Sequence, residues 1–210
     1  MPYTAEDLHT QCEHAAQIVL RTPFDNSQPA QILAVGLFVR AVETVGAALV
    51  IYPTHFHSAI MTLARTLLEA TAQLGFLSKN PKLHYDALHL MDLEEKYLRL
   101  DASSQPHDDL SELRQAIEQY KHKGIKRPSL KKMLTVWGYA DVYESYRFLS
   151  QHSHTSLTSI ADLSIQHAHI KLGSRMSEDT ENAIFGLMVE LLKEGEKAFL
   201  YILTPNAPAP

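Results

Sequence analysis

Hydrophobic side chains recur every three or four residues along most of the chain, which is the spacing of an amphipathic α-helix. The exception is the stretch 162–177, where the run "SIQHAHIKLG" alternates enough to fit either a short extended piece or an irregular loop. The pattern predicts an all-α bundle of about seven or eight helices. The expected helices are 4–21, 30–52, 54–77, 82–100, 107–123, 129–137, a segment that begins after Asp141, and 177–203.

Prolines, glycines and acidic residues mark the ends of these helices. Pro29 stands where a proline starts a helix well, because the first turn has no use for the missing N–H. Pro53 separates the second helix from the third, and Gly124 and Gly138 follow the fifth and the sixth. Ser177 begins the last helix, since the acidic residues that follow it favour the positive end of the helix dipole.

Composition limits the class of protein. A chain of 210 residues is expected to form one domain, here residues 1–203, with a disordered tail at 204–210. The net charge of −5 argues against a generally basic nucleic-acid-binding protein, but not against a local basic surface. The single cysteine, Cys12, allows neither an intramolecular disulfide nor a cysteine-based zinc site.

The two most apolar stretches, 30–52 and 58–77, both contain charged residues. Arg40 and Glu43 interrupt the first stretch, and an arginine and a glutamate interrupt the second. Because a membrane-spanning helix tolerates few such charges, we interpret both stretches as buried helices. We therefore expect a cytoplasmic protein without a membrane span.

A polar stripe runs along the otherwise apolar helix 54–77. Arg65 and Glu69 are four residues apart and lie on one face, where two threonines and a glutamine flank them at helical spacing. One interpretation is an ion pair covered by the chain, or an edge of the helix that reaches solvent. The other is a polar site inside the bundle, because a buried charge is costly unless it is paired and hydrogen-bonded.

The segment Tyr146–His154, with the sequence YRFLSQHSH, supplies groups that suit such a site. Arg147, Ser150 and His154 recur at spacings of three and four residues, so they lie on one side of the predicted helix. An arginine binds two phosphate oxygens, and a histidine takes or gives a proton near neutral pH. Together these groups suit the cleavage of RNA by attack of its own 2′-OH on the neighbouring phosphorus.

The two polar segments resemble those of a known family. The sequence R-T-L-L-E (Arg65–Glu69), followed by Y-R-F-L-S-x-x-x-H (Tyr146–His154), is similar to two elements of a bacterial all-α domain family of unknown function. Members of that family share an R-x-x-x-E helix and a later Y-R-x-L-S-x-x-x-H element. The resemblance covers residues 53–154, which is about half of the chain.

The second segment also resembles the R-x(4–6)-H pattern of the HEPN superfamily. The arginine is Arg147, and the histidine is either His152 or His154. HEPN domains are helical bundles, often dimeric, and many are metal-independent ribonucleases of toxin–antitoxin and phage-defence systems. The segment departs from typical HEPN nucleases at Phe148, where those enzymes carry a polar residue.

The HEPN resemblance implies an RNA-binding protein or a metal-independent endoribonuclease of defence or toxin type, without a cofactor. It also implies a homodimer, which brings two copies of a small motif together, and a cognate antitoxin or other protein partner. In this scheme His154 is the general acid or base, Arg147 holds the phosphate, and Ser150 orients either one. The candidate catalytic residues are Arg65, Glu69, Arg147, Ser150, His152 and His154.

A basic segment lies just before the motif. Six basic residues and no acidic residue occur between Tyr120 and Tyr139, which is unusual in a chain of negative net charge. They suit a surface that guides an anionic polymer such as RNA, or a solvated loop around Pro128. The candidate nucleic-acid-binding residues are Lys121, Lys123, Lys126, Arg127, Lys131 and Lys132.

Two alternatives need no catalysis on RNA. In the first, Arg147 pairs with Glu144 or Glu69, the two histidines only end a helix, and the protein is a non-catalytic interaction module. In the second, His167 and His169 share a face of an extended segment and bind a metal ion together with the carboxylate of Glu69. The sequence assigns no residue firmly as a metal ligand.

Overall fold

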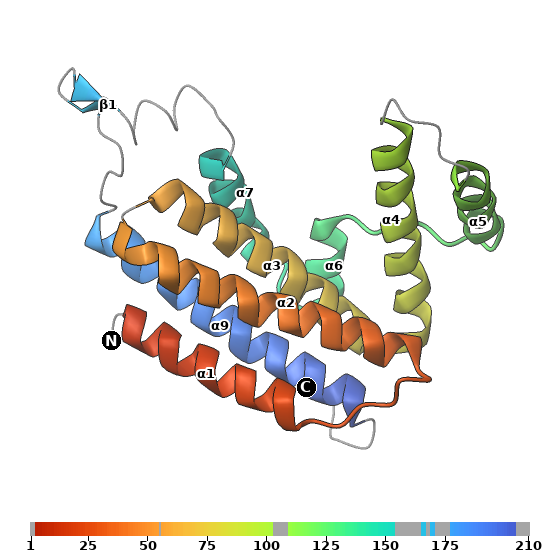
Figure 1. Cartoon of the computed structure of the whole chain (residues 1–210), viewed down its shortest axis with the longest axis horizontal. Helices are drawn as coiled ribbons and strands as arrows, with labels where there is room; N and C mark the ends of the chain where they lie inside the picture. Colours follow the sequence, from red (N-terminus) through yellow and green to blue (C-terminus); the bar gives the residue numbers. More distant parts are fainter. Residues whose placement is uncertain are drawn as a thin grey trace.

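The computed structural model describes residues 3–54, 56–102, 109–153, 165–166, 169–170 and 177–204. Within these ranges the chain forms eight α-helices, one short 3₁₀ helix and one pair of two-residue strands (Figure 1). The helices are α1 (Ala5–Arg21), α2 (Pro29–Ile51), α3 (His57–Lys79), α4 (Pro81–Asp101), α5 (Leu110–His122), α6 (Leu130–Trp137), α7 (Val142–Ser153) and α9 (Glu178–Leu203). The 3₁₀ helix η1 is Tyr52–Thr54, and β1 (Ile165–Gln166) pairs antiparallel with β2 (His169–Ile170).

The prediction of an all-α fold is confirmed. Helix α3 begins at His57, three residues later than the expected start at residue 54. The reason is η1, which surrounds Pro53, since a proline has no N–H to continue the hydrogen bonding of α2. The described part of the ambiguous stretch 162–177 is extended at β1 and β2.

The expected helix ends are largely built as the sequence indicates. Pro29 occupies the first turn of α2, and the Ser177 hydroxyl accepts a hydrogen bond from the Thr180 N–H at the start of α9. Gly138 ends α6 with φ of 105°, a left-handed conformation that glycine adopts without strain. Asp141 before α7 is an exception, because its backbone carbonyl accepts a hydrogen bond from the Glu144 N–H, whereas its carboxylate accepts none from the described residues.

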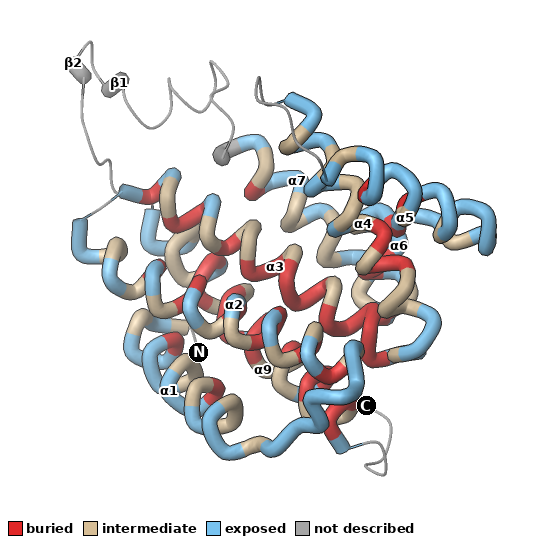
Figure 2. Tube along the Cα trace, turned by 45° about the vertical axis from the view of Figure 1, so that its right-hand side comes forward, coloured by how far each residue is buried: buried red, intermediate tan, exposed pale blue. Residues whose placement is uncertain are grey.

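Helix α3 lies at the centre of the bundle, as its apolar sequence predicts. It packs against α2, α9, α6 and α7, and its buried residues form the middle of the core in Figure 2. Helix α1 closes the far side against α2 and α9. The rings of Phe38 in α2 and Phe199 in α9 stack with centroids 4.6 Å apart, which ties two of the long helices together.

Helices α4 and α5 form an antiparallel hairpin that projects from one end of the bundle (Figure 1). Helix α4 contacts α2 and α3 near its start, and α5 packs mainly against α4. The His84 ring stacks on Phe76 of α3 with centroids 3.7 Å apart and hydrogen-bonds the Phe76 carbonyl. The hairpin is therefore fixed at its base, where it stands beside the surfaces of α2 and α3.

One stretch of the described residues, Pro29–Thr54, is long and apolar enough to cross a membrane by its length and composition. A core helix of a soluble protein meets the same criterion. The helix packs against α1, α3, α4 and α9 in this structure, and Arg40 and Glu43 lie within it. One side of the helix is therefore covered by other helices, and the cytoplasmic location stays a prediction.

Candidate functional site

The polar stripe of α3 lies on the one side of this helix that reaches solvent. Arg65 Nε donates a hydrogen bond to Glu69 Oε1 at 3.0 Å, and the two side chains are 25% and 36% exposed. Thr62 is exposed, while Thr66 and Gln73 are half-buried. The structure therefore agrees with the interpretation of a helix edge that reaches solvent, and the pair is not sealed inside the bundle.

Arg65 connects the α3 motif to the α7 motif. Its guanidinium lies over the ring of Tyr146, 5.2 Å from the ring centroid, in a cation–π contact. Burial lowers the pKa of Arg65, but its hydrogen bond to Glu69 and its interaction with Tyr146 raise that pKa more, so the net pKa is raised. The arginine thus stays cationic, and two segments far apart in the sequence meet at one contact.

Arg147 lies on the outer face of α7, away from this contact. Its side chain is 59% exposed, and Nη1 donates to Glu144 Oε2 at 3.0 Å. This is one of the two pairings expected for Arg147 if the protein is a non-catalytic interaction module. Ser150 is half-buried and follows the buried Leu149, whereas Arg147 is exposed. The side chains of Arg147 and Ser150 therefore have different surroundings.

The two candidate histidines fall at or just beyond the end of the described part of α7. His152 belongs to α7, but its side chain lies outside the described part of the structure. His154 also lies outside the described residues. The roles given to both histidines therefore stay predictions.

The basic segment before α7 is neutralised in part by acids of α4. Arg127 Nη2 donates to Glu95 Oε1 at 2.8 Å, and Lys121 Nζ lies 3.5 Å from Glu94 Oε1. The remaining cations are placed differently. Lys123 lies over the Tyr120 ring, and Lys131 of α6 lies over the ring of Tyr143 in α7, 5.8 Å from its centroid.

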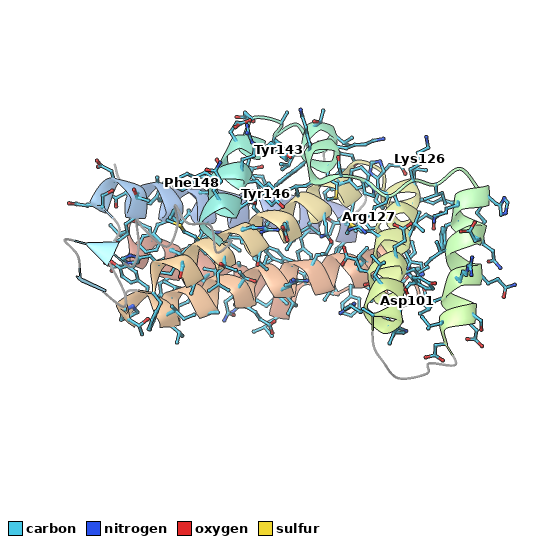
Figure 3. The ribbon with its side chains drawn as sticks, turned by 90° about the horizontal axis from the view of Figure 1, so that it is seen from above. Asp101, Lys126, Arg127, Tyr143, Tyr146 and Phe148 are labelled. Carbon is cyan, nitrogen blue, oxygen red and sulfur yellow. The ribbon has the colours of Figure 1, made fainter. Side chains whose placement is uncertain are left out.

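Two lysines of this segment, Lys126 and Lys132, are exposed and form no ion pair with any residue that the structure describes. Lys131 is also exposed, and its one described partner is the neutral Tyr143 ring. Figure 3 shows Lys126 in the loop before α6, and Tyr143 and Tyr146 along α7. Four of the six predicted cations, Lys123, Lys126, Lys131 and Lys132, thus have no ion pair with a described residue, and the last three lie in or just before α6.

A metal site finds no support within the described ranges. No group of three His, Cys, Asp or Glu side chains there lies close enough to hold a metal ion. The side chains of His167 and His169, on which the metal alternative depends, lie outside those ranges. Glu69 instead accepts a hydrogen bond from Arg65.

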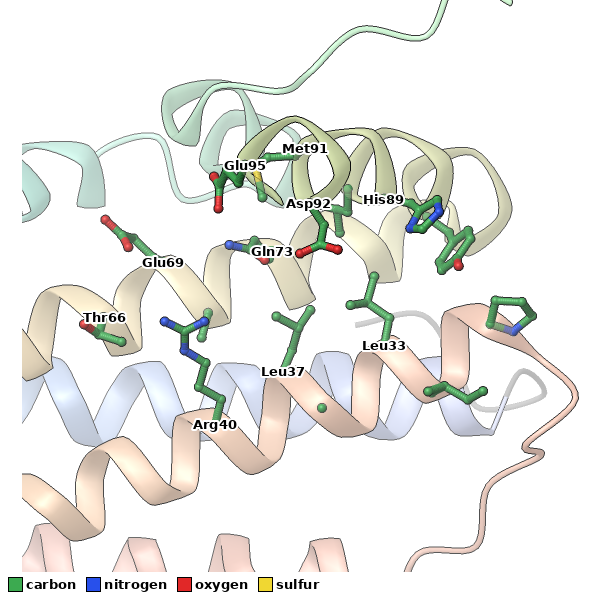
Figure 4. A pocket seen from close by; sticks show the side chains of 16 residues that line it. Leu33, Leu37, Arg40, Thr66, Glu69, Gln73, His89, Met91, Asp92 and Glu95 are labelled. Atoms are coloured by element: carbon green, nitrogen blue, oxygen red, sulfur yellow. The ribbon is translucent and has the colours of Figure 1, made fainter. Parts of the chain in front are cut away.

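A groove of about 680 Å³ lies between α2, α3 and the base of α4, and the sequence did not indicate it (Figure 4). The signals that point to it are Arg40, which interrupts an apolar helix, and the polar face of α4. Both become meaningful only once the packing of α4 beside α2 is known. The main polar residues that line the groove are Arg40, Glu69, Gln73, His89, Asp92 and Glu95.

The segment that builds these surfaces matches a family model. Residues 31–169, about two thirds of the chain, match the model of a family of unknown function (DUF5677). This chain belongs to the DUF5677 family. A search of curated proteins and a search of solved structures gave no match.

The match to DUF5677 covers every candidate catalytic residue. It extends from the first turn of α2 through α7 and includes the Arg65–Tyr146 contact, the basic segment and every groove residue except Pro29. Helices α1 and α9 pack on α2 and α3 but lie outside the matched residues. The DUF5677 segment of this chain therefore shares its core with helices on both sides of it in the sequence.

We expect the Arg65–Tyr146 contact to contribute measurably to stability. A double-mutant cycle with Arg65→Met and Tyr146→Leu should give a coupling free energy of about 0.5–2 kcal/mol, because the guanidinium is partly desolvated over the ring. Urea unfolding of the four proteins measures it. The cycle of Arg21→Met with Tyr146→Leu is the control, since Arg21 is exposed at the end of α1. Equal coupling in both cycles would contradict the contact.

Proposed function

We propose that this protein binds RNA along α6 and α7 and cuts it as a HEPN-like, metal-independent endoribonuclease of defence or toxin type. The proposal includes a cytoplasmic homodimer, because one chain supplies a single arginine–histidine set. The observation that carries it is the position of Lys131 over Tyr143, which brings the cations of α6 beside the helix that carries Arg147. Phosphates along an RNA strand need such a row of cations near the reacting group.

The ion pair of Arg147 does not prevent phosphate binding. Both partners are more than half exposed, and exposed pairs of this kind contribute about 0–1 kcal/mol. A phosphate offers the guanidinium two oxygens in a bidentate arrangement and so competes well with Glu144. Phe148 of α7, which is 43% exposed, adds a ring on which a base stacks.

The proposed reaction needs only proton transfers and charge stabilisation. One histidine takes the proton of the ribose 2′-OH, the 2′ oxygen bonds to phosphorus, and the bond from phosphorus to the 5′ oxygen breaks. The leaving 5′ oxygen receives a proton from a second histidine, supplied by the other copy of the chain. Arg147 offsets the charge that grows on the phosphate oxygens. The products are a 2′,3′-cyclic phosphate and a 5′-hydroxyl.

RNA binding should depend on Lys126, Lys131 and Lys132, the unpaired lysines that lie in or just before α6. The variant Lys126→Gln/Lys131→Gln/Lys132→Gln is expected to bind single-stranded RNA more weakly. It should also flatten the plot of log affinity against log salt by about 2 units, because each phosphate-bound cation contributes about 0.7. Fluorescence anisotropy at several salt concentrations measures both effects.

The control variant removes the same charge elsewhere. Lys79, Lys82 and Lys96 are exposed lysines of α3 and α4 that form no ion pair with the described residues. Changing all three to glutamine should leave the salt slope close to that of the unchanged protein. Equal slopes for both triple variants, or no RNA binding by the unchanged protein, would reject the proposed interface.

A non-catalytic interaction module is the second candidate. Two observations favour it. Arg147 forms an ion pair with Glu144, and Arg65 contacts both Glu69 and Tyr146, so each arginine has a structural role. This candidate predicts that Arg65→Ala or Glu69→Ala lowers the melting temperature and leaves RNA binding and cleavage unchanged. Melting curves recorded beside the RNA assays separate the two candidates.

A further inference from the structure

The groove between α2, α3 and α4 presents two charges that no residue in the described part of the chain neutralises. Its other charged groups have partners, since Glu69 accepts a hydrogen bond from Arg65 and Glu95 accepts one from Arg127. Arg40 and Asp92 have no ion pair or hydrogen bond from their side chains to any residue that the structure describes. Each remains available to a ligand.

These two charges come from opposite walls of the groove. Arg40 extends from α2, Asp92 extends from α4, and Figure 4 shows both side chains directed into the space between the helices. They have opposite signs, yet they do not approach within ion-pair distance of each other. A bound molecule with one anionic and one cationic group satisfies both.

Apolar side chains line part of the surface between the two charges. Leu37 and Leu88 are buried and line the groove, together with the half-buried Leu33 and Met91. Gln73, half-buried on α3, adds an amide that donates and accepts hydrogen bonds. The volume of about 680 Å³ lies within the usual range for small-molecule sites.

We propose that this groove binds a small zwitterionic molecule with an apolar body, of the amino-acid or short-peptide class. Its carboxylate pairs with Arg40, whose guanidinium suits two carboxylate oxygens, and its ammonium group pairs with Asp92. Its apolar side chains cover the leucine and methionine surface. The carboxylates of Glu69, Asp92 and Glu95 disfavour a polyanion, so this site is separate from the proposed RNA interface and does not depend on it.

Leucine, leucyl-leucine and trileucine are suitable probes, because they carry the same charges at increasing separation. Each is compared with its N-acetyl form, which lacks the ammonium group, and with its amide, which lacks the carboxylate. Titration of the ¹⁵N-labelled full chain followed by NMR gives affinities and locates the bound molecule. At least one free probe should bind and change the NMR chemical shifts of groove residues. Each blocked form of that probe should bind at least about tenfold more weakly.

Single substitutions then assign each charge to its partner. In Arg40→Gln the free probe and its amide should bind equally, and in Asp92→Asn the free probe and its N-acetyl form should bind equally. Both residues are exposed and without a described partner, so the variants are expected to fold. Glu43→Gln, which changes an exposed charge of α2 outside the groove, should leave all affinities unchanged.

Three results would overturn the proposal. The first is that none of the free probes binds at concentrations up to about 10 mM, which is weak even for a fragment-sized ligand. The second is that free and blocked forms bind equally to the unchanged protein. The third is that the NMR shifts fall outside the groove. The RNA affinity of the variant Lys126→Gln/Lys131→Gln/Lys132→Gln, which leaves the groove unchanged, tests the RNA interface separately from these three outcomes.

Discussion

RNA cleavage by the His154→Ala variant is expected to be about 100- to 10,000-fold slower than cleavage by the unchanged protein. The proposed reaction moves a proton from the 2′-OH and another to the leaving oxygen, and alanine does neither. The rate is measured under single-turnover conditions with a labelled RNA in the presence of a chelator. His122→Ala, which removes an exposed histidine of α5, is the control and should keep the full rate.

Arg147→Ala should slow the same reaction by about 100-fold or more, because the growing charge on the phosphate loses its cation. Arg147→Lys should recover part of the rate, since lysine keeps the charge but not the bidentate geometry. Arg114→Ala, an exposed arginine of α5, is the matched control. Because the Arg147–Glu144 pair is exposed, melting temperatures should change little. Equal rates for Arg147→Ala and Arg114→Ala would remove Arg147 from the reaction.

The second large effect concerns the contact between α3 and α6. Trp137 is buried, and a side chain at Gly75 would overlap its indole ring. Trp137→Ala is expected to lower the free energy of unfolding by about 3–5 kcal/mol. Gly75→Ala should lower it by about 1–3 kcal/mol, although alanine favours a helix, because the rigid ring must move. Urea unfolding measures both.

The double variant and one control test the cause. In the Trp137→Ala background, Gly75→Ala should become neutral or stabilising by up to about 1 kcal/mol, since the ring is gone and the helix propensity remains. Gly46→Ala in α2, where a new Cβ meets open space, should stabilise by a similar amount. A destabilisation by Gly75→Ala that is the same in both backgrounds would show that α3 and α6 do not approach so closely.

The helices and their ends follow from local chemistry, which explains why the sequence predicts them. The spacing of apolar residues marks α2 and α3, and Pro29, Gly138 and Ser177 act on their own or adjacent turns. The same locality explains the error at the start of α3. The turn around Pro53 is a short 3₁₀ helix rather than a clean stop, and the spacing of apolar residues does not distinguish the two.

The candidate site was predictable only in part, because charge pairing between helices is tertiary. The Arg65–Glu69 pair follows from a spacing of four residues, but the contact with Tyr146 requires α7 to pack on α3. The segment around Arg127 is locally free of acids, yet α4 supplies Glu95 from 32 positions earlier. Net charge along a segment therefore overstates the number of cations that a ligand can reach.

The groove shows a second limit. Arg40 counts in the sequence as an interruption of an apolar helix, and Asp92 is one of several charges on an amphipathic helix. They line the same groove only because the α4–α5 hairpin lies beside α2, and the stacking of His84 on Phe76 fixes the base of that hairpin. The direction in which the hairpin leaves the bundle decides which residues face each other, and no local pattern encodes that direction.

The most direct test of the proposed function is the chemistry of the RNA ends after incubation with the unchanged protein in excess chelator. Mass spectrometry of the fragments identifies those ends. The proposed mechanism predicts fragments with 2′,3′-cyclic phosphate and 5′-hydroxyl ends, formed at a rate that the chelator does not change. Intact RNA, or cleavage that stops when the chelator is added, would contradict it.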